Sequence, residues 1–589
     1  MLKNYENLLK YMFIVFIVAI IVLFILIFLN IIKIDRLNGI IANKKFRFVF
    51  SCFAIIMSIS YIVLPGFIEG HDIYDRLSHI QALTNEIKNG TFPVYIFSDY
   101  LSGYGLGMGL VYTDFFYYIP AFLHVVGVPL LLSYKILIII IVFSTYFSML
   151  FCTKKITKSI DVSIMISSLY VLSSYFLNDL YIRADIGENL AMIFIPFILL
   201  GLYEIIFSDN DKGYYLTIGL VGVYISHILS CYLCIFLVLF IVIANIKSIF
   251  NDKKRLKNLL IYGLLSVGIV SFLWIPMFDS MFSNNMVIAN QSNSDLTSSR
   301  VLNPLFVFGE LFYYNVSKNW TPPGIGFVFI FLTLLFIFDK NKKNKYSTQL
   351  IIIGYIFLFM TTYLFPWSIG SKIFGVMEFP WRFYFIVTSC LLFGFSMFIN
   401  NTNIINKTKL FILLSLFMIF TYTFFTYNIF IYSPMYKDTY EIKYSVASGY
   451  ELPIGTDVDY INKRGQIITS NNDIDITFEK KGTNMNIIYS NNKYKDSYID
   501  LPLIYYKGYV AKDNGNKIVV NKSDNNLIRL NICNDSGKIE VYYGLTNTRL
   551  IGYIISIISF VYFVLICKIR RNYVNNNNKR ISTKNLFSS

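Results

Sequence analysis

Charged residues are scarce in this chain of 589 residues. Aspartate, glutamate, lysine and arginine together make up 15% of it, whereas soluble globular domains usually carry about 25%. Apolar residues make up 56%, and many apolar runs reach the roughly 20 residues that a helix needs to cross a bilayer. The composition excludes a soluble globular protein and predicts an all-α polytopic membrane protein.

Cysteines and familiar catalytic motifs are scarce as well. Of the seven cysteines, only Cys533 lies in the polar block 430–548, which excludes a disulfide framework there. Cys231 and Cys234 lie in an apolar run without a second ligand pair, which favours packing over zinc binding or redox chemistry. The sequence contains no P-loop, nucleophile elbow or HExxH motif, so the common signatures of nucleotide, ester and zinc-dependent peptide hydrolysis are absent.

About thirteen apolar runs are candidate membrane spans. They occupy residues 12–32, 47–66, 132–151, 160–177, 189–207, 214–229, 231–246, 259–277, 325–338, 349–366, 382–399, 409–429 and 549–567. No small-residue cleavage pattern follows the first run, so we expect no cleavable signal peptide. The long run 214–246 must break near residues 227–231 to give two spans.

Lysine and arginine are distributed unevenly between the connecting segments. The net charge is +16, and the basic residues concentrate near 33–47, 154–158, 247–257, 340–345 and 407–409 and in the tail after 567. The positive-inside rule makes these segments cytoplasmic, which predicts a multi-pass plasma-membrane protein with its N-terminus outside and its tail inside. Because these residues do not share one folded surface, we expect no nucleic-acid partner.

Residues 430–548 are the one large polar block on the predicted outer side. Short alternating runs such as 474–478 and 485–489, separated by turn signals such as Asn514-Gly515, predict a small β-sandwich. The predicted organisation is an extra N-terminal span and cytoplasmic loop (1–46), a transmembrane domain (47–429), an extracytoplasmic β-domain (430–548) and a final span with a basic tail (549–589).

The segment 70–79, GHDIYDRLSH, places charge beside a predicted span. Its spacing puts four side chains on one face of a helix: Asp72, Asp75, Arg76 and His79. A carboxylate at this place could accept a proton from an attacking hydroxyl or bind a divalent cation. An interfacial amphipathic helix with an Asp72–Arg76 ion pair explains the pattern equally well.

Two further outer segments carry isolated arginines. In residues 181–188, Arg183 could grip a phosphate, while Asp185 and Glu188 could bind sugar hydroxyls or a metal; an ion pair within the loop is the alternative. In residues 377–384, Arg382 could bind an anion or extend to the headgroups. The glycine- and aromatic-rich segment 100–118 could line a lipid or sugar groove or simply pack.

These motifs, in this order, resemble those of bacterial multi-spanning proteins described as "6-pyruvoyl-tetrahydropterin synthase-related", close to YfhO-type proteins, in the GT-C glycosyltransferase superfamily. The similar segments are 70–79, 89–93 (NGTFP), 103–105 (GYG), 117–120 (YYIP), 179–188 (DLYIRADIGE), 274–276 (WIP), 379–383 (FPWRF), 501–503 (LPL) and 505–509 (YYKGY). The resemblance covers most of residues 45–570 and implies a GT-C-like transmembrane bundle.

The resemblance also implies an activity. Such a protein would move a sugar from a polyprenyl-phosphate donor to a cell-wall polymer, glycolipid or glycoprotein at the outer membrane face. Asp72 takes the place of the essential acidic residue in the first outer loop, as general base or, with Asp75, as ligand of a divalent Mg or Mn ion. Arg183 and Arg382 would hold the lipid phosphate, and the remaining substrate-binding candidates are Arg76, His79, Tyr104, Asp185 and Glu188.

Two other functions explain part of the sequence. A transporter or flippase of lipid-linked saccharides accounts for the spans and the arginines, but leaves the β-domain little to do. A non-catalytic scaffold for envelope assembly uses the β-domain as a binding module, and it predicts that Asp72, Arg183 and Arg382 are dispensable together.

Overall fold

The computed structural model describes residues 2–34, 37, 39–208, 212–290, 294–309, 324–340, 344–432, 436–444, 449–463, 466–494 and 496–586. The predicted outer segment 278–324 therefore lies partly outside the described residues. Three of the predicted cytoplasmic basic residues also lie outside the described residues: Arg36, Lys342 and Lys343.

In the described part of the chain, seven helices are long and apolar enough to cross a membrane. They are α1 (Leu2–Phe28), α2 (Lys44–Ile59), α5 (Leu130–Thr157), α8 (Ile186–Ile206), α19 (Tyr384–Asn401), α20 (Lys407–Tyr427) and α22 (Asn547–Leu586). Two bent segments raise the number to nine if each is one span. The first combines α6 (Ile160–Val171), α7 (Ser174–Leu177) and the π-helical η6 (Asn178–Arg183); the second combines α12 (Lys253–Ile269) and α13 (Ser271–Ser283).

The remaining predicted spans correspond to four shorter apolar helices, so the expected number of thirteen is not confirmed. These are α9 (Tyr214–Ser226), α10 (Ile228–Ala244), α16 (Val328–Phe338) and α17 (Lys345–Met360). The 11 residues of α16 rise only about 16 Å, roughly half the thickness of a hydrocarbon core. The predicted break in 214–246 is found at His227, whose extended backbone separates α9 from α10.

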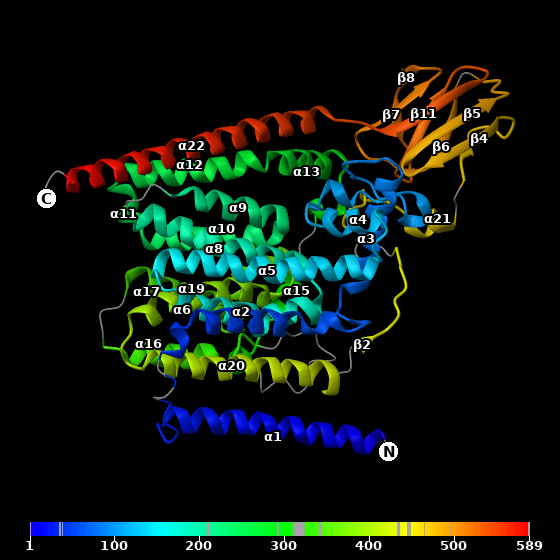
Figure 1. The fold of residues 1–589 in the computed structure, drawn as a ribbon. Coiled ribbons are helices and arrows are strands. Elements are labelled where there is room, and N and C mark those ends of the chain that lie inside the picture. The colour runs from blue at the N-terminus through cyan, green and yellow to red at the C-terminus, as the bar shows by residue number, and fades with distance from the viewer. Residues whose placement is uncertain are drawn as a thin grey trace.

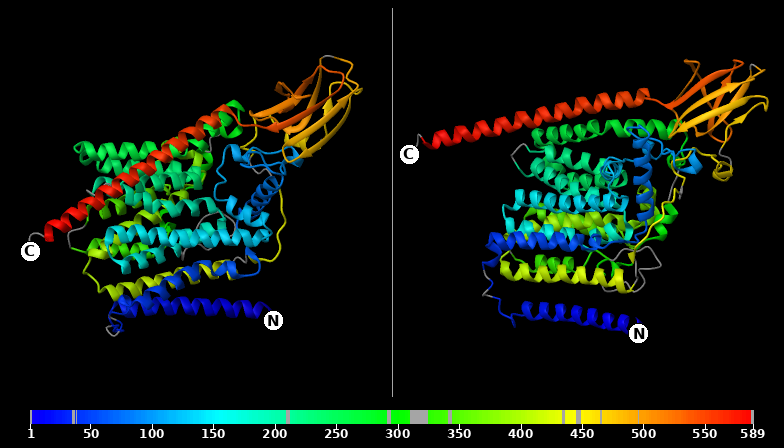
Figure 2. Two further views of the ribbon diagram at one scale, coloured as in Figure 1. Left: turned by 45° about the horizontal axis from the view of Figure 1, so that its top comes forward. Right: turned by 45° about the vertical axis from the view of Figure 1, so that its right-hand side comes forward.

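The helices lie side by side in one bundle (Figures 1 and 2). In an apolar stretch of 18 residues, 83% of α8 and 94% of α19 is buried, compared with 11% of α1 and 6% of α22. Helices that are apolar on every side belong in the interior, and α8 and α19 are the interior helices. The outlying α1 and α22 lie on opposite sides of the bundle, and the start of α1 and the finish of α22 lie at its opposite ends (Figure 1).

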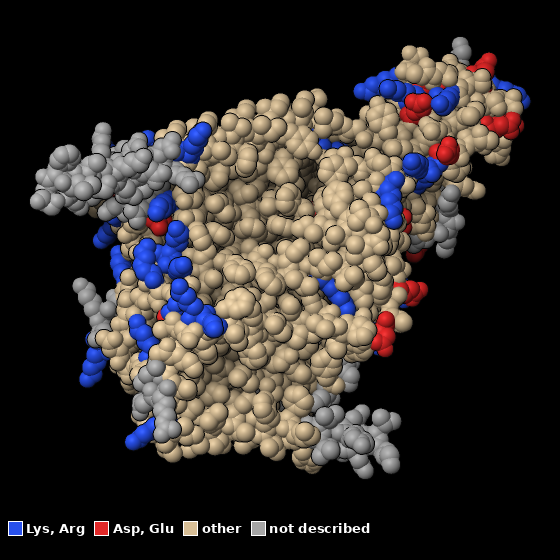
Figure 3. Space-filling model, in the orientation of Figure 1, with Lys and Arg blue, Asp and Glu red and all other residues tan. Residues whose placement is uncertain are grey.

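Charge is segregated between the two ends of the bundle. On the face drawn in Figure 3, lysine and arginine dominate the end where α22 finishes, whereas most of the acidic side chains lie at the other end and on the sheets, mixed with basic ones. This is the pattern that the positive-inside rule predicts. The middle of the face is almost free of charge, as a surface in contact with lipid requires.

The C-terminal sheet region holds two antiparallel sheets, with strand orders β3-β6-β10-β9 and β4-β5-β11-β7-β8. Their strands are β3 (Ile468–Thr469), β4 (Asp475–Lys481), β5 (Asn484–Ser490), β6 (Ser497–Ile504), β7 (Tyr509–Asp513), β8 (Asn516–Ile518), β9 (Val520–Lys522), β10 (Leu527–Ile532) and β11 (Gly537–Tyr543). In β5, Met485, Ile487 and Tyr489 are buried and alternate with exposed residues, which is the predicted two-residue period.

Two helices connect the bundle with the sheets: α3 (Ile73–Lys88) and α4 (Tyr118–Val125). The short strand β1 (Phe67–Ile68), which follows α2 in the chain, pairs with β2 (Tyr436–Lys437), which follows α20. The other short helices are α11 (Ile246–Phe250), α14 (Val287–Asn290), α15 (Ser294–Ser299), α18 (Trp367–Phe374) and α21 (Val458–Lys463). The acidic end of the bundle therefore carries α3, α4 and the sheets together (Figure 2).

Candidate functional site

The start of α3 is fixed against η6 by main-chain hydrogen bonds. The amide of His71 donates to the carbonyl oxygen of Ile182 at 2.8 Å, and the amide of Asp72 donates to that of Arg183 at 2.9 Å. Gly70 permits this approach, because a Cβ there would lie 2.6 Å from another main-chain oxygen of the same segment. The sequence Gly-His-Asp thus places Asp72 beside the buried turn that carries Arg183.

Arg183 lies at the centre of a buried group of carboxylates. Its guanidinium contacts the Asp179 carboxylate and lies 3.0 Å from Asp185 Oδ2 and 3.2 Å from Glu188 Oε2. It also covers the Trp381 ring, with 4.4 Å between Cζ and the ring centroid. Asp179 precedes Arg183 by four residues, a spacing that brings the two side chains together along a helical segment.

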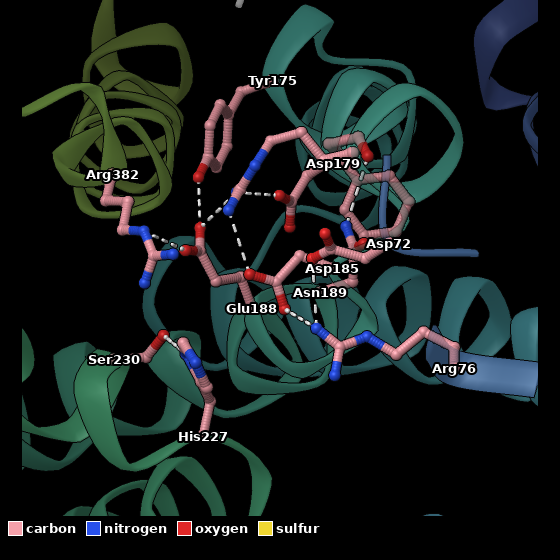
Figure 4. A network of polar contacts seen from close by, with 12 residues as sticks. Asp72, Arg76, Tyr175, Asp179, Asp185, Glu188, Asn189, His227, Ser230 and Arg382 are labelled. Atoms are coloured by element: carbon pink, nitrogen blue, oxygen red, sulfur yellow. Dashed lines mark hydrogen bonds and ion pairs between the residues drawn. The ribbon is translucent and has the colours of Figure 1, made fainter. Parts of the chain in front are cut away.

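Glu188 joins this group to the start of α19. The Tyr175 hydroxyl donates to Glu188 Oε2, and Arg382 Nε lies 3.5 Å from Glu188 Oε1 (Figure 4). The side chains of Asp179 and Glu188 are 0% and 1% exposed. Removing one partner of such a buried pair leaves an uncompensated charge, which is strongly destabilising.

Arg76 connects the buried group with Asp72. Its Nη2 lies 3.2 Å from Asp72 Oδ2 and 3.7 Å from Asp185 Oδ1. The Asp72 side chain is 34% exposed. Alternating charges therefore run without interruption from the buried Asp179 to a carboxylate in contact with solvent, and we call these seven residues the ion-pair network: Asp72, Arg76, Asp179, Arg183, Asp185, Glu188 and Arg382 (Figure 4).

Comparison with known proteins identifies the family. A family model described as bacterial membrane protein YfhO matches residues 81–450, which is more than half of the chain. The chain belongs to the YfhO family. The predicted resemblance to YfhO-type proteins is confirmed, and the match includes Arg183 and Arg382 but begins after Asp72.

Two further matches are weaker. An uncharacterized protein from Lactococcus lactis subsp. cremoris (strain MG1363) is 24% identical over 598 residues, covering 89% of this YfhO-family chain and 95% of the relative. The cryo-EM structure of the arabinofuranosyltransferase AftD from Mycobacteria has 10% identity and a TM-score of 0.40. That match covers 68% of this chain but only 28% of AftD, a likeness too weak to decide fold or function.

Nine site residues were predicted from the sequence of this YfhO-family protein, and six of them belong to the ion-pair network. The other three, Asp75, His79 and Tyr104, lie outside it. His79 Nε2 lies 2.8 Å from Asp114 Oδ1, under the rings of Phe97 and Tyr117. Asp75 is exposed on α3 and forms no ion pair among the described residues. Tyr104 is fully buried, and its carbonyl oxygen accepts a hydrogen bond from Ile504 of β6, so it lies at the contact with the sheets.

Three residues of the candidate site were not predicted from the sequence: Tyr175, Asp179 and His227. The Asp179–Arg183 spacing was a usable signal, since carboxylate and arginine four residues apart form ion pairs on helices. Tyr175 gave no signal, because it lies in an apolar run. His227 lies in the break between α9 and α10, packs against Gly187 and shares a hydrogen bond of 2.8 Å with Ser230.

The described residues offer no ready-made cluster of protein ligands for a metal ion. Among the described residues, no group of three or more His, Cys, Asp or Glu side chains is placed to hold a metal ion. Asp72, one of the two proposed ligands, is engaged by Arg76. The Mg or Mn ion expected at Asp72 and Asp75 therefore stays a prediction.

The contacts also distinguish the two arginines that were expected to hold phosphate. Arg183 faces three protein carboxylates, so its charge is already compensated. Among the described residues, Arg382 has one ion pair, at 3.5 Å, and its Nε has no hydrogen-bond partner. Arg300 lies beside the same ring as Arg382, with Cζ 4.2 Å and 5.7 Å from the Phe379 centroid respectively. Arg382 and Arg300 are therefore the better candidates for binding an anion.

Proposed function

We propose that this YfhO-family protein is a glycosyltransferase of the outer membrane face, which moves a sugar from a polyprenyl-phosphate donor to a cell-envelope acceptor. One observation carries the proposal: a solvent-exposed carboxylate, Asp72, is held beside a buried network of arginines and carboxylates. The network lies at the acidic end of the bundle, away from the basic segments. Together, the Asp72 carboxylate and the arginines of the network supply a proton acceptor and cations for a leaving phosphate.

Asp72 is the proposed general base. The acceptor hydroxyl attacks the anomeric carbon of the sugar, and its proton passes to the Asp72 carboxylate. As the new carbon–oxygen bond forms, the bond between sugar and phosphate breaks, and its electron pair goes to the phosphate oxygen. Arg76 contacts both Asp72 and Asp185, so it fixes the position of the base relative to the network.

Arg382 and Arg300 are the proposed partners of the lipid phosphate. Negative charge grows on the phosphate as the bond breaks, and a cation placed in advance stabilises that charge. Glu188 holds Arg382 from the protein side, while Arg183 compensates the buried carboxylates. Arg183 is thus a positioning residue, which changes the role that its arginine side chain suggested in the sequence.

The C-terminal sheets are the proposed acceptor-binding module. They contact the loop before α4 through Lys480, whose ammonium donates to the carbonyl oxygens of Gly103 and Pro502. That loop leads to Asp114 and Tyr117, which lie beside His79 on α3. An acceptor bound to the sheets would lie at the same end of the bundle as Asp72.

The decisive test compares Asp72→Asn with Asp75→Asn. Both changes remove one carboxylate from the exposed start of α3, but only Asp72 belongs to the ion-pair network. In a deletion strain complemented with each variant at equal protein level, we expect Asp72→Asn to leave envelope glycans at the deletion phenotype and Asp75→Asn to restore them. Full restoration by Asp72→Asn would refute the assignment of the base.

A flippase of lipid-linked saccharides is the second candidate, because ionisable residues buried among membrane helices are typical of transport pathways. Asp179 and Arg183 lie in the second half of a segment bent by 42°, as a broken span or a re-entrant loop would be. Proteoliposomes separate the two candidates. Translocation of labelled lipid-linked sugar without any glycoside product would favour the flippase.

A further inference from the structure

Arg549, in the first turn of α22, is a buried cation outside the ion-pair network. The residue is 2% exposed. Its Nη2 donates to the Tyr543 hydroxyl at 2.7 Å, while Nε and Nη1 are buried without a hydrogen-bond partner. Among the described residues it forms no ion pair within 4.0 Å. Burying a charge without a counter-charge is costly, so this arrangement calls for a ligand.

A second arginine shows what Arg549 lacks. Arg529 lies over the Tyr498 ring at 3.9 Å, and it also forms a two-pronged pair with Asp500 at 2.7 and 2.8 Å. Arg549 lies over the rings of Tyr95 and Tyr543 at 3.7 and 4.7 Å but has no such carboxylate. The rings stabilise the cation and leave its remaining donors free for an anion.

The acidic side chain nearest along α13 does not supply the missing charge. Asp279 accepts hydrogen bonds from Lys507 at 2.7 Å, from Thr548 at 2.8 Å and from Ser283 at 3.0 Å. The charge of Asp279 is therefore compensated by Lys507 and not by Arg549. This holds even though Thr548, another partner of Asp279, directly precedes Arg549 in the chain. The positive charge of Arg549 stays uncompensated by the described side chains around it.

Arg549 lines a small pocket. One wall comes from α13, with Phe272, Leu273 and Pro276, and another comes from the segment 109–113; Ser280 adds a hydroxyl. Ile228 also lines it and directly follows His227 of the candidate site. The pocket therefore shares the start of α10 with that site, and Arg549 lies on α22.

We propose that this pocket binds a phosphate-bearing ligand, either a lipid headgroup or free phosphate, through the guanidinium of Arg549. Arginine is the side chain best suited to phosphate. Leu550, Ile551 and Ile554 follow Arg549 on α22 and are exposed, so the acyl chains of a lipid would lie along an apolar surface. The proposal does not depend on sugar transfer.

The test uses the full-length protein purified in detergent and three probes. These are phosphatidylglycerol, diacylglycerol with the same acyl chains, and inorganic phosphate, with binding measured by native mass spectrometry. We expect Arg549→Met to weaken binding of the phosphate-bearing probe at least about tenfold, the usual value of charge-assisted hydrogen bonds. Binding of diacylglycerol stays unchanged. Arg529→Met is the matched control, because it removes a ring-stacked arginine that already has a carboxylate partner.

The probes also separate the two sources of phosphate. A loss confined to phosphatidylglycerol supports a lipid headgroup, and a loss confined to inorganic phosphate supports free phosphate. Equal binding of both by wild-type protein and Arg549→Met overturns the proposal, as does a wild-type protein that prefers neither probe to diacylglycerol. If the Met variant does not fold, Arg549→Gln keeps a donor for Tyr543 and serves in its place.

Discussion

The amide of Asp72 donates a hydrogen bond to the carbonyl oxygen of Arg183 at 2.9 Å. The two residues are more than a hundred positions apart, and each was singled out in a different segment of the sequence. This bond fixes the exposed carboxylate relative to the buried arginine. The consequences of that relationship, and of the contacts around it, can be tested by substitution.

Gly70→Ala tests the approach of α3 to η6. A Cβ at Gly70 would lie 2.6 Å from a main-chain oxygen, so the start of α3 must move away and Asp72 with it. We expect a loss of about 1–3 kcal/mol in stability, typical of overpacking, and loss of complementation in the deletion strain. Gly263→Ala is the control, because nothing lies within 4 Å of its added Cβ; an equal effect of both changes would contradict the prediction.

Glu188→Gln tests the buried part of the ion-pair network. Arg382 loses its ion pair, whereas Arg183 keeps Asp179 and Asp185, and an uncompensated buried charge typically costs about 3–5 kcal/mol. Glu69→Gln breaks an exposed pair with Lys437 at 3.4 Å and should cost less than about 1 kcal/mol. Thermal unfolding of the two variants in detergent measures the difference, and similar melting temperatures would show that the network contributes little to stability.

Lys480 gives a prediction for pH. Burial lowers the pKa of its ammonium group from 10.5 to about 8, and the Glu86 carboxylate partly opposes this. Between these two values the unfolded chain holds the proton and the folded protein does not, so stability should rise with pH. Relative to Lys480→Met, the wild-type protein should gain on the order of 2 kcal/mol from pH 7.5 to 10. The exposed neighbour Lys481 provides the control variant Lys481→Met, which should follow the wild-type profile. Parallel profiles of wild type and Lys480→Met would contradict the lowered pKa.

Arg300 and Arg382 are expected to bind phosphate together, since both lie beside Phe379. Binding of a polyprenyl phosphate without sugar measures this step alone. Arg300→Met and Arg382→Met should each weaken it about tenfold, whereas Lys372→Met, which removes an exposed charge from α18, should not. If all three variants bind like the wild type, the lipid phosphate lies elsewhere.

The positions of most helices were predicted from the sequence, because apolar runs and the residues that interrupt them are local features of the chain. The break at His227 is an example. The sheets were harder to predict, since β6 contains Pro502, which cannot donate to a strand ladder. The register between β6 and β10 shifts between Leu527 and Arg529, and Pro502 lies opposite this irregularity. A proline therefore fits this strand.

The ion-pair network was predictable only in part. Arginines and carboxylates beside predicted spans indicated a site, and the YfhO resemblance singled out Asp72. The pairing of each arginine depends on contacts between distant segments, so the sequence did not separate the role of Arg183 from that of Arg382. Nothing in the sequence singled out Arg549, because an arginine at the start of a span is common. Its burial and its missing partner are visible only in the tertiary structure.

The sequence by itself determined the membrane-spanning character, the uneven distribution of its charges, the polar C-terminal block and the segments proposed to carry chemistry. Composition and periodicity suffice for these, because each depends on residues within one turn, strand or span. The tertiary structure alone decided that Asp72 meets Arg183 through η6, that Tyr175 and Glu188 share a hydrogen bond, and that Arg549 is buried without a counter-charge. Such contacts join residues on different helices and strands, and their energies depend on burial, which only the packed fold creates.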